Sequence, residues 1–356
     1  MRAWTDRVAA LLSIAVALVG VWWWTSPASY PFGAGDRVTV SLSHLFEHDV
    51  AGIMMVAAGA VGLAAILLRD LRLALVELLF FGVVMSDAGI ISLFGYVLGL
   101  GMPLGLAGFV AVACARRQRS GFVVLGVVAV LAAAALATGL LSAESVSTYA
   151  GSLATSFGSY GGRIAWTLAN AAAFLIWLAV ALRALGGRSA GWAAEAAWTT
   201  PEAAARWGRV ATIGAALCPL PYGLYRLTWL TPWPVRDFGD ATLTMAMRLQ
   251  GSIIAVSALA GCVLTLGLIG RWGEIFPRWI PVLGGRPVPV GLPVAAGGFM
   301  AGMFFLSGTG MTVNAVERGM PAMLLLFPYP LWAPLLGAAV LAYWLRRRAP
   351  RPIAVG

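Results

Sequence analysis

Long runs of hydrophobic residues alternate along this chain with short polar or Pro/Gly-rich segments. A helix that crosses the hydrocarbon core of a bilayer needs about 20 mostly apolar residues. Ten stretches meet this requirement: 8–24, 50–68, 73–93, 97–115, 121–141, 164–185, 209–231, 248–270, 290–312 and 324–345. The pattern therefore predicts an all-α polytopic transmembrane helix bundle of about ten spans.

The third and fourth stretches belong to one apolar run, from Leu73 to Ala115. This run is too long for a single span, so it must contain a boundary between two spans. We place that boundary between residues 93 and 97, where residues that weaken a helix begin to gather: Gly95, Gly99, Gly101 and Pro103.

The arginines favour one orientation of these spans. All 24 basic residues are arginines, and basic residues are enriched in the cytoplasmic loops of membrane proteins. With the N-terminus inside, only six arginines fall in outer segments: Arg37, Arg163, Arg226, Arg236, Arg248 and Arg318. The rule therefore predicts that both the N-terminus and the C-terminus are cytoplasmic.

The composition supports a membrane protein and excludes several other classes. Of 356 residues, 60% are hydrophobic and only 11% are charged, with a mean hydropathy of +0.87. This balance excludes a soluble or disordered chain, and the net charge of +10 is spread over short loops, which argues against a nucleic-acid partner. The expected partner is the lipid bilayer, and no motif indicates an oligomeric state. Because arginine replaces lysine throughout, we expect a high-GC bacterial source and a place in the bacterial cytoplasmic membrane.

A weak internal repeat suggests how the chain is organised. The pattern W-x-x-R-V-A at Trp4–Ala9 is echoed by W-x-R-V-A at Trp207–Ala211, and each opens a predicted span. If the two are related, spans one to four and spans seven to ten form a parallel repeat. The predicted division is then a four-span unit at 1–115, two linking spans with a cytoplasmic amphipathic loop at 116–206, and a second four-span unit with a basic tail at 207–356. The alternative is chance similarity in a sequence rich in Ala, Leu and Trp.

One predicted cytoplasmic loop carries a resemblance to other proteins. Residues 271–289 read R-W-G-E-x-x-P-R-W-x-P-x-L-G-G-R-x-V-P, and P-L-P-Y-G-L-Y-R-L-T-W stands upstream at 219–229. These patterns resemble multipass membrane proteins of actinobacteria, a group with no assigned activity, over roughly the second half of the chain. The resemblance implies a source and a topology, and it transfers no catalytic or binding residue.

The only two histidines, His44 and His48, lie just before the second predicted span and stand four residues apart. On a helix they would share one face with Glu47, and two imidazoles with a carboxylate are a ligand set for a divalent metal. The string H-x-x-E-H also matches the inverted zincin pattern. The alternative needs no cofactor: these residues form a helix start at the membrane interface, where histidines meet lipid headgroups and Ser43 caps the helix.

Asp87 lies about two-thirds of the way along the third predicted span. An ionised carboxylate in hydrocarbon costs several kcal/mol, so such a residue is expected to face a cavity or a partner. His48 stands at the start of the adjoining antiparallel span, just before residues 50–68, and we therefore expect Asp87 to cluster with His44, Glu47 and His48.

In the seventh predicted span Arg226 is flanked by Tyr222 and Tyr225, and two prolines, Pro219 and Pro221, precede it. Proline removes a helical hydrogen bond, and a broken helix beside an arginine can bind an anion or a carboxylate. The alternative is that the arginine reaches outward to the headgroups or pairs with one of three acids, Asp87, Asp237 or Asp240.

Three functions remain open. A secondary transporter or permease for a small-molecule substrate fits the spans, the broken helix and the intramembrane charges, and it is our first hypothesis. A membrane-embedded metal enzyme fits the histidine pair, and a non-catalytic assembly partner fits a chain in which none of these residues acts individually. The sequence holds no Walker A motif, no G-x-G-x-x-G motif after a strand and no nucleophile elbow, which disfavours ATP-driven and dinucleotide-dependent roles.

Overall fold

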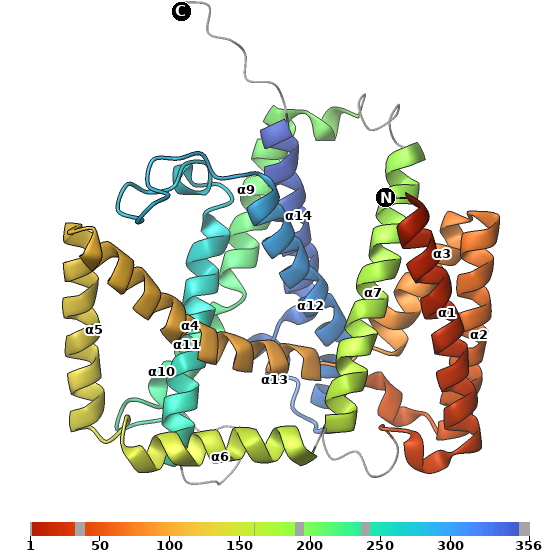
Figure 1. Ribbon diagram of the computed structural model, residues 1–356, viewed down its shortest axis with the longest axis horizontal. Coiled ribbons are helices and arrows are strands. Elements are labelled where there is room, and N and C mark those ends of the chain that lie inside the picture. The colour runs from red at the N-terminus through yellow and green to blue at the C-terminus, as the bar shows by residue number, and fades with distance from the viewer. Residues whose placement is uncertain (1, 33–39, 160, 189–195, 236–242, 349–356) are drawn as a thin grey trace, which may run out of the picture. The chain divides into compact units, whose positions relative to one another are not determined.

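The computed structural model describes residues 2–32, 40–159, 161–188, 196–235 and 243–348 (Figure 1). Throughout these ranges the regular structure is helical, with two isolated antiparallel bridges in addition. The chain folds into two compact units, each built from segments that are distant in sequence. The first unit comprises Met1–Ile91, Tyr160–Ala203 and Ala301–Leu324, and the second comprises Ser92–Ser159, Ala204–Met300 and Leu325–Gly356.

The first unit packs three long helices and one interrupted helix, joined by short helical turns. Its elements are α1 (Arg2–Thr25), η1 (Pro27–Ser29), η2 (Leu42–Leu45), α2 (His48–Leu68), α3 (Leu71–Leu79), the π-helix η3 (Phe80–Val84), α7 (Gly161–Arg188), η4 (Ala197–Thr199) and the second part of α12 (Gly291–Glu317). Helices α1 and α2 lie side by side, α7 packs on α1, and α3 packs on both α2 and α7 (Figure 1).

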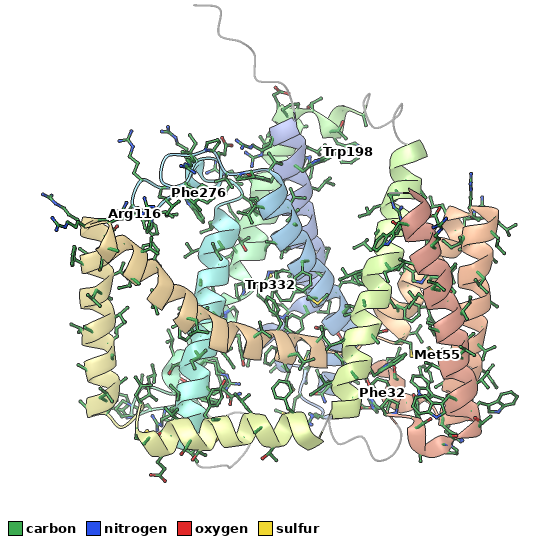
Figure 2. All side chains as sticks on the ribbon, viewed as in Figure 1. Phe32, Met55, Arg116, Trp198, Phe276 and Trp332 are labelled. Atoms are coloured by element: carbon green, nitrogen blue, oxygen red, sulfur yellow. The ribbon has the colours of Figure 1, made fainter. Side chains whose placement is uncertain are left out.

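Small residues bring α1 and α2 into close contact. A Cβ atom added to Gly20 would lie 2.6 Å from the carbonyl oxygen of Gly52, and one added to Gly52 would lie 2.7 Å from that of Gly20. Glycine at both positions lets the two backbones approach, as in many pairs of membrane helices. Around this contact Phe32, Met55 and Trp177 are completely buried, and Figure 2 labels the first two among the packed side chains of this unit.

The third predicted span is not a continuous helix. Helix α3 passes into the π-helix η3, the backbone from Met85 to Ala88 is not helical, and α4 (Gly89–Ala115) then begins. The boundary that we placed between residues 93 and 97 is therefore wrong, because α4 runs through it without a break. The glycines and Pro103 weaken this helix without ending it.

The second unit is also helical. Its elements are nearly all of α4, α5 (Arg119–Ala137), α6 (Ala143–Ser159), α9 (Pro201–Leu217), α10 (Leu220–Thr228), α11 (Met245–Leu266), η5 (Arg271–Gly273), the first part of α12, and α14 (Tyr329–Arg348), which the short α13 (Met323–Leu326) precedes. Helix α10 packs on α11, and α11 packs on α6. The seventh predicted span is interrupted as its prolines predicted, because α9 ends at Leu217 and α10 begins after Pro219.

The loop at 271–289 folds back on itself as a compact hairpin. The Phe276 amide donates to the Arg286 carbonyl oxygen at 2.9 Å, and Figure 2 labels Phe276 in this loop. The last turns of α14 hold the loop in place. The Tyr343 hydroxyl donates to the Gly273 carbonyl oxygen at 2.8 Å, and Arg347 pairs with Glu274 at 3.5 Å.

Seven helices of the described residues are long and apolar enough to cross a membrane, which supports a multi-pass membrane protein. They correspond to seven of the ten predicted stretches, and the other three are 73–93, 97–115 and 209–231. Two of these three are interrupted helices, and the third is part of the long helix α4. The total of ten spans, the cytoplasmic termini, the repeat and the three-part division remain predictions.

Candidate functional site

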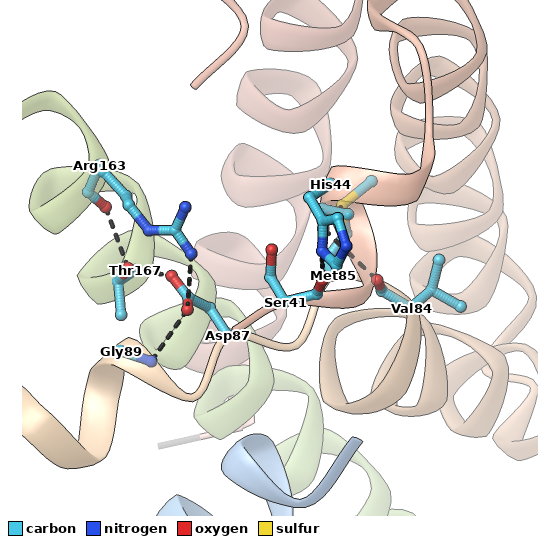
Figure 3. A network of polar contacts seen from close by, with 9 residues as sticks. Ser41, His44, Val84, Met85, Asp87, Gly89, Arg163 and Thr167 are labelled. Atoms are coloured by element: carbon cyan, nitrogen blue, oxygen red, sulfur yellow. Dashed lines mark hydrogen bonds and ion pairs between the residues drawn. The ribbon is translucent and has the colours of Figure 1, made fainter. Parts of the chain in front are cut away.

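Asp87 lies in the first unit, in the non-helical segment between η3 and α4 (Figure 3). Its side chain is completely buried. The backbone here pairs with the segment that precedes η2: Ser41 and Asp87 form an isolated antiparallel bridge, and the Ala88 amide donates to the Val40 carbonyl oxygen at 2.9 Å. The interruption of the helix thus places a buried carboxylate beside a second non-helical segment.

The Asp87 carboxylate is held by three groups. Nη2 of Arg163 donates to Oδ1 at 3.1 Å, and the Gly89 amide donates to the same oxygen at 2.9 Å. The Thr167 hydroxyl lies 2.5 Å from Oδ2 and 3.0 Å from the Arg163 carbonyl oxygen. A hydroxyl has one proton, so Thr167 donates to one of these two acceptors at a time, and the charged carboxylate is the stronger acceptor.

Arg163 opens a polar stripe along the buried face of α7. Its guanidinium lies over the Phe32 ring, 5.0 Å from the centroid. One turn further lies Thr167, and Asn170 follows, donating from Nδ2 to the Phe81 carbonyl oxygen of the π-helix at 3.3 Å. Oδ1 of Asn170 is buried and has no hydrogen-bond partner among the described residues. Polar side chains of α7 therefore contact the interrupted helix at two points, Phe81 in the π-helix and Asp87 after it.

A histidine extends this network on the other side of Ser41. Nδ1 of His44 contacts the Ser41 carbonyl oxygen, and Nε2 lies 2.9 and 3.0 Å from the two carboxylate oxygens of Glu317 at the end of α12. Figure 3 shows His44 and Asp87 on opposite sides of Ser41. The backbone of Ser41 thus joins the His44–Glu317 pair to the Asp87–Arg163 pair.

The predicted histidine pair does not share a helix face. His44 lies in the 3-10 turn η2, Glu47 is extended, and α2 begins only at His48. These residues line an open hollow of about 340 Å³ together with Pro27, Tyr30, Leu45 and Phe46. In the part of the chain that the structure describes, no group of three or more His, Cys, Asp or Glu side chains is placed to hold a metal ion. The cluster of these residues with Asp87 is therefore not assembled here, and metal binding stays a prediction.

A second buried acid of the first unit, Glu77, has a carboxylate oxygen without a hydrogen-bond partner in the described ranges. Glu77 lies on the buried face of α3, one turn before Phe81, and only 2% of its surface is exposed. The oxygen without a partner in these ranges is Oε1. An unpaired buried polar atom destabilises a fold, so Glu77 is a candidate for a functional role.

The predicted residues of the seventh span gather in the second unit. Nε of Arg226 donates to the Tyr222 hydroxyl at 3.0 Å, and the guanidinium lies 4.0 Å from the centroid of the Trp229 ring. Tyr225 packs edge-on against Trp229, with 5.8 Å between the ring centroids. The break at Pro219 is thus followed by a short helix on which Arg226 lies against the rings of Tyr222 and Trp229.

The sequence indicates that Asp87 needs a partner, and the structure identifies that partner as Arg163, which the sequence analysis did not connect with it. Arg163 was counted among the outer arginines, because it stands one residue before a predicted span. The spacing of Arg163, Thr167 and Asn170 was the available signal, since steps of four and three residues place all three on one helix face. Comparisons with models of known families, with curated proteins and with solved structures find no match to the chain.

Proposed function

We propose that this multi-pass membrane protein is a secondary transporter or permease for a small molecule, and that Asp87 and Arg163 form its central polar site. The observation that carries the proposal is a buried ion pair located where a helix is interrupted. The contacts of Asp87, the polar stripe of α7 and the unpaired oxygen of Asn170 all belong to this site.

Two physical arguments support transport over a purely structural role. Non-helical backbone at membrane depth is tolerated only where it is buried in protein or lines a cavity, and transporters use discontinuous helices to build substrate and ion sites. A buried ion pair is also a poor way to stabilise a fold, because hydrophobic residues of similar volume are often as stable or more so. Both features therefore favour a site that is retained for its chemistry.

The geometry suggests how such a site would work. The Gly89 amide and the Thr167 hydroxyl hold the Asp87 carboxylate independently of Arg163. An anionic group of a substrate that replaces Asp87 at the guanidinium would leave the carboxylate with these two neutral donors, and a cation that replaces Arg163 at the carboxylate would leave the guanidinium over the Phe32 ring. Binding at this site would thus exchange one ion pair for another.

The test is solute uptake into proteoliposomes. The purified full-length chain is reconstituted and offered a panel of labelled amino acids, sugars and organic acids under an imposed pH gradient and membrane potential. We expect uptake of at least one class above empty liposomes, and a loss of about tenfold or more in Asp87→Asn and Arg163→Gln, because removing one partner of a buried ion pair costs about 3–5 kcal/mol and tenfold corresponds to only about 1.4 kcal/mol.

The matched control is Glu144→Gln, which removes an exposed carboxylate at the start of α6. This variant should transport at the wild-type rate. If Asp87→Asn and Arg163→Gln also transport at the wild-type rate, the polar site is not the transport site. If no member of the panel enters above background, the assembly-partner hypothesis takes first place.

A membrane-embedded metal enzyme is the second candidate, and the open hollow beside His44, Glu47 and His48 favours it. Both ring nitrogens of His44 are engaged, by the Ser41 carbonyl oxygen and by Glu317. A metal ion would have to take the place of one of these contacts, or add Glu317 to its ligands. Stoichiometric metal in the purified protein would favour this function over transport.

A further inference from the structure

Two arginines of the second unit meet at one tryptophan. The guanidinium of Arg226, on α10, lies over the Trp229 ring, and Nη1 of Arg248, on α11, donates to the Trp229 carbonyl oxygen. A Cβ atom added to Gly251 would lie 3.6 Å from Cδ of Arg226. The Arg226 side chain therefore lies against α11 one turn beyond Arg248, and the two guanidinium groups contact the ring and the backbone carbonyl of the same residue, Trp229.

The hydrogen-bond donors in this cluster exceed the acceptors. Nε of Arg248 and Nε1 of Trp229 are both buried, and neither has a hydrogen-bond partner within the described ranges. In the same ranges no carboxylate is paired with Arg226 or Arg248. Two cations at one site repel each other, and buried donors without acceptors cost free energy, so an anion at this point would remove both penalties.

The position of the cluster along α11 indicates what kind of anion it meets. Arg248 is the fourth residue of α11, a helix long and apolar enough to cross a membrane, so it lies about 5 Å from the start of that helix. The ends of membrane spans lie at the level of the lipid headgroups, whichever way the span is oriented. Phosphate groups are the anions concentrated at that level.

We propose that Arg226, Arg248 and Trp229 form a binding site for a phosphate group, carried by a phospholipid headgroup or by a phosphorylated solute. A planar guanidinium matches the geometry of phosphate oxygens, and a phosphate has enough oxygens to accept from both arginines and from the indole N–H. The site lies in the second unit and does not depend on the transport proposal, whose residues all lie in the first unit.

The experiment is a binding titration of the delipidated, detergent-purified full-length chain. Two probes are used in parallel: short-chain phosphatidylglycerol and inorganic phosphate. We expect saturable binding that weakens about tenfold or more in Arg226→Gln and in Arg248→Gln, because a hydrogen bond to a charged group is worth about 1.5–3 kcal/mol. The control Arg318→Gln removes an exposed arginine after α12 and should leave the affinity unchanged.

The two probes distinguish the two sources of phosphate. Binding of phosphatidylglycerol alone assigns the site to a lipid headgroup, and binding of inorganic phosphate assigns it to a solute. The proposal is overturned if neither probe binds, or if Arg226→Gln and Arg248→Gln bind as tightly as the wild type.

Two milder variants guard against loss of folding. Trp229→Phe removes the unpaired indole N–H and keeps an aromatic ring beneath Arg226, and Arg248→Lys keeps the charge and removes the unpaired Nε donor. We expect both to bind more weakly than the wild type, with unfolding midpoints in the absence of the probes close to the wild-type value. Wild-type affinity in both would also overturn the proposal.

Discussion

Replacing Asp87 or its partner Arg163 should lower the free energy of unfolding strongly, and the two losses should not add up in the double variant. Arg163→Gln leaves a completely buried carboxylate with two donors, the Gly89 amide and the Thr167 hydroxyl. Breaking a buried ion pair by removing one partner costs about 3–5 kcal/mol. Because these two hydrogen bonds remain, we expect the free energy of unfolding to fall by about 3 kcal/mol, the lower end of that range.

The double variant Asp87→Asn/Arg163→Gln removes both charges, so no unpaired charge remains buried. Its loss of stability should be smaller than the sum of the two single losses, and residues in direct contact have interaction energies of about 0.5–3 kcal/mol. We expect a value of about 2–3 kcal/mol for this pair, since 8% of Arg163 and none of the Asp87 side chain is exposed.

The assay is unfolding of the purified chain in mixed micelles of sodium dodecyl sulfate and a mild detergent, followed by far-UV circular dichroism. The control cycle uses Glu274 and Arg347, which form a longer ion pair of 3.5 Å with the Glu274 side chain 36% exposed. Exposed pairs contribute about 0.2–1 kcal/mol, so this cycle should be nearly additive. An interaction energy for Asp87 and Arg163 no larger than the control value would refute the buried pairing.

The remaining predictions concern the histidine pair and the unpaired acid of α3. The two contacts of His44 favour a metal content far below one ion per chain by plasma mass spectrometry, since a metal ion must displace one of them or add Glu317 to its ligands; one metal per chain, lost in His44→Ala/His48→Ala, would instead confirm the predicted metal site. We expect Glu77→Leu to raise the free energy of unfolding by about 1–3 kcal/mol in the same detergent titration, because Oε1 of Glu77 is buried without a partner. A lower stability of this variant would show that the carboxyl group has a stabilising contact.

The length of apolar stretches was enough to predict most of the helices. Seven helices fall on predicted stretches: α1, α2, α5, α7, α11, α12 and α14. A membrane-spanning helix satisfies its backbone hydrogen bonds within itself, so the length and hydrophobicity of its own residues are enough to identify it. The interruption after Leu217 was also predictable, since proline acts locally.

The interruption before Asp87 was not predictable in the same way. The stretch from Phe80 to Ala88 contains no proline, and its non-helical part, from Met85 to Ala88, is held by distant segments, through the bridge with Ser41 and the ion pair with Arg163. The pairing of His44 with Glu317 is equally remote, because 273 positions separate the two residues. A single sequence shows which polar residues must find partners, and tertiary packing decides which partners they find.

The most direct test of the transport site is whether water reaches it from either side of the membrane. Ser41 is completely buried beside Asp87, and its hydroxyl has no hydrogen-bond partner among the described residues, so Ser41→Cys is a conservative probe. The probe is placed in a background in which the three native cysteines are replaced by alanine. A charged, membrane-impermeant thiol reagent is then added to each side of proteoliposomes in turn, with Ser147→Cys on α6 as an exposed control.

A transport site must open to water, so we expect the cysteine at position 41 to react from at least one side and Asp87→Asn to change the reaction rate. A cysteine at position 41 that stays unreactive from both sides, while the control at position 147 is labelled, would show that the buried ion pair belongs to a permanently closed core and would contradict the proposed function.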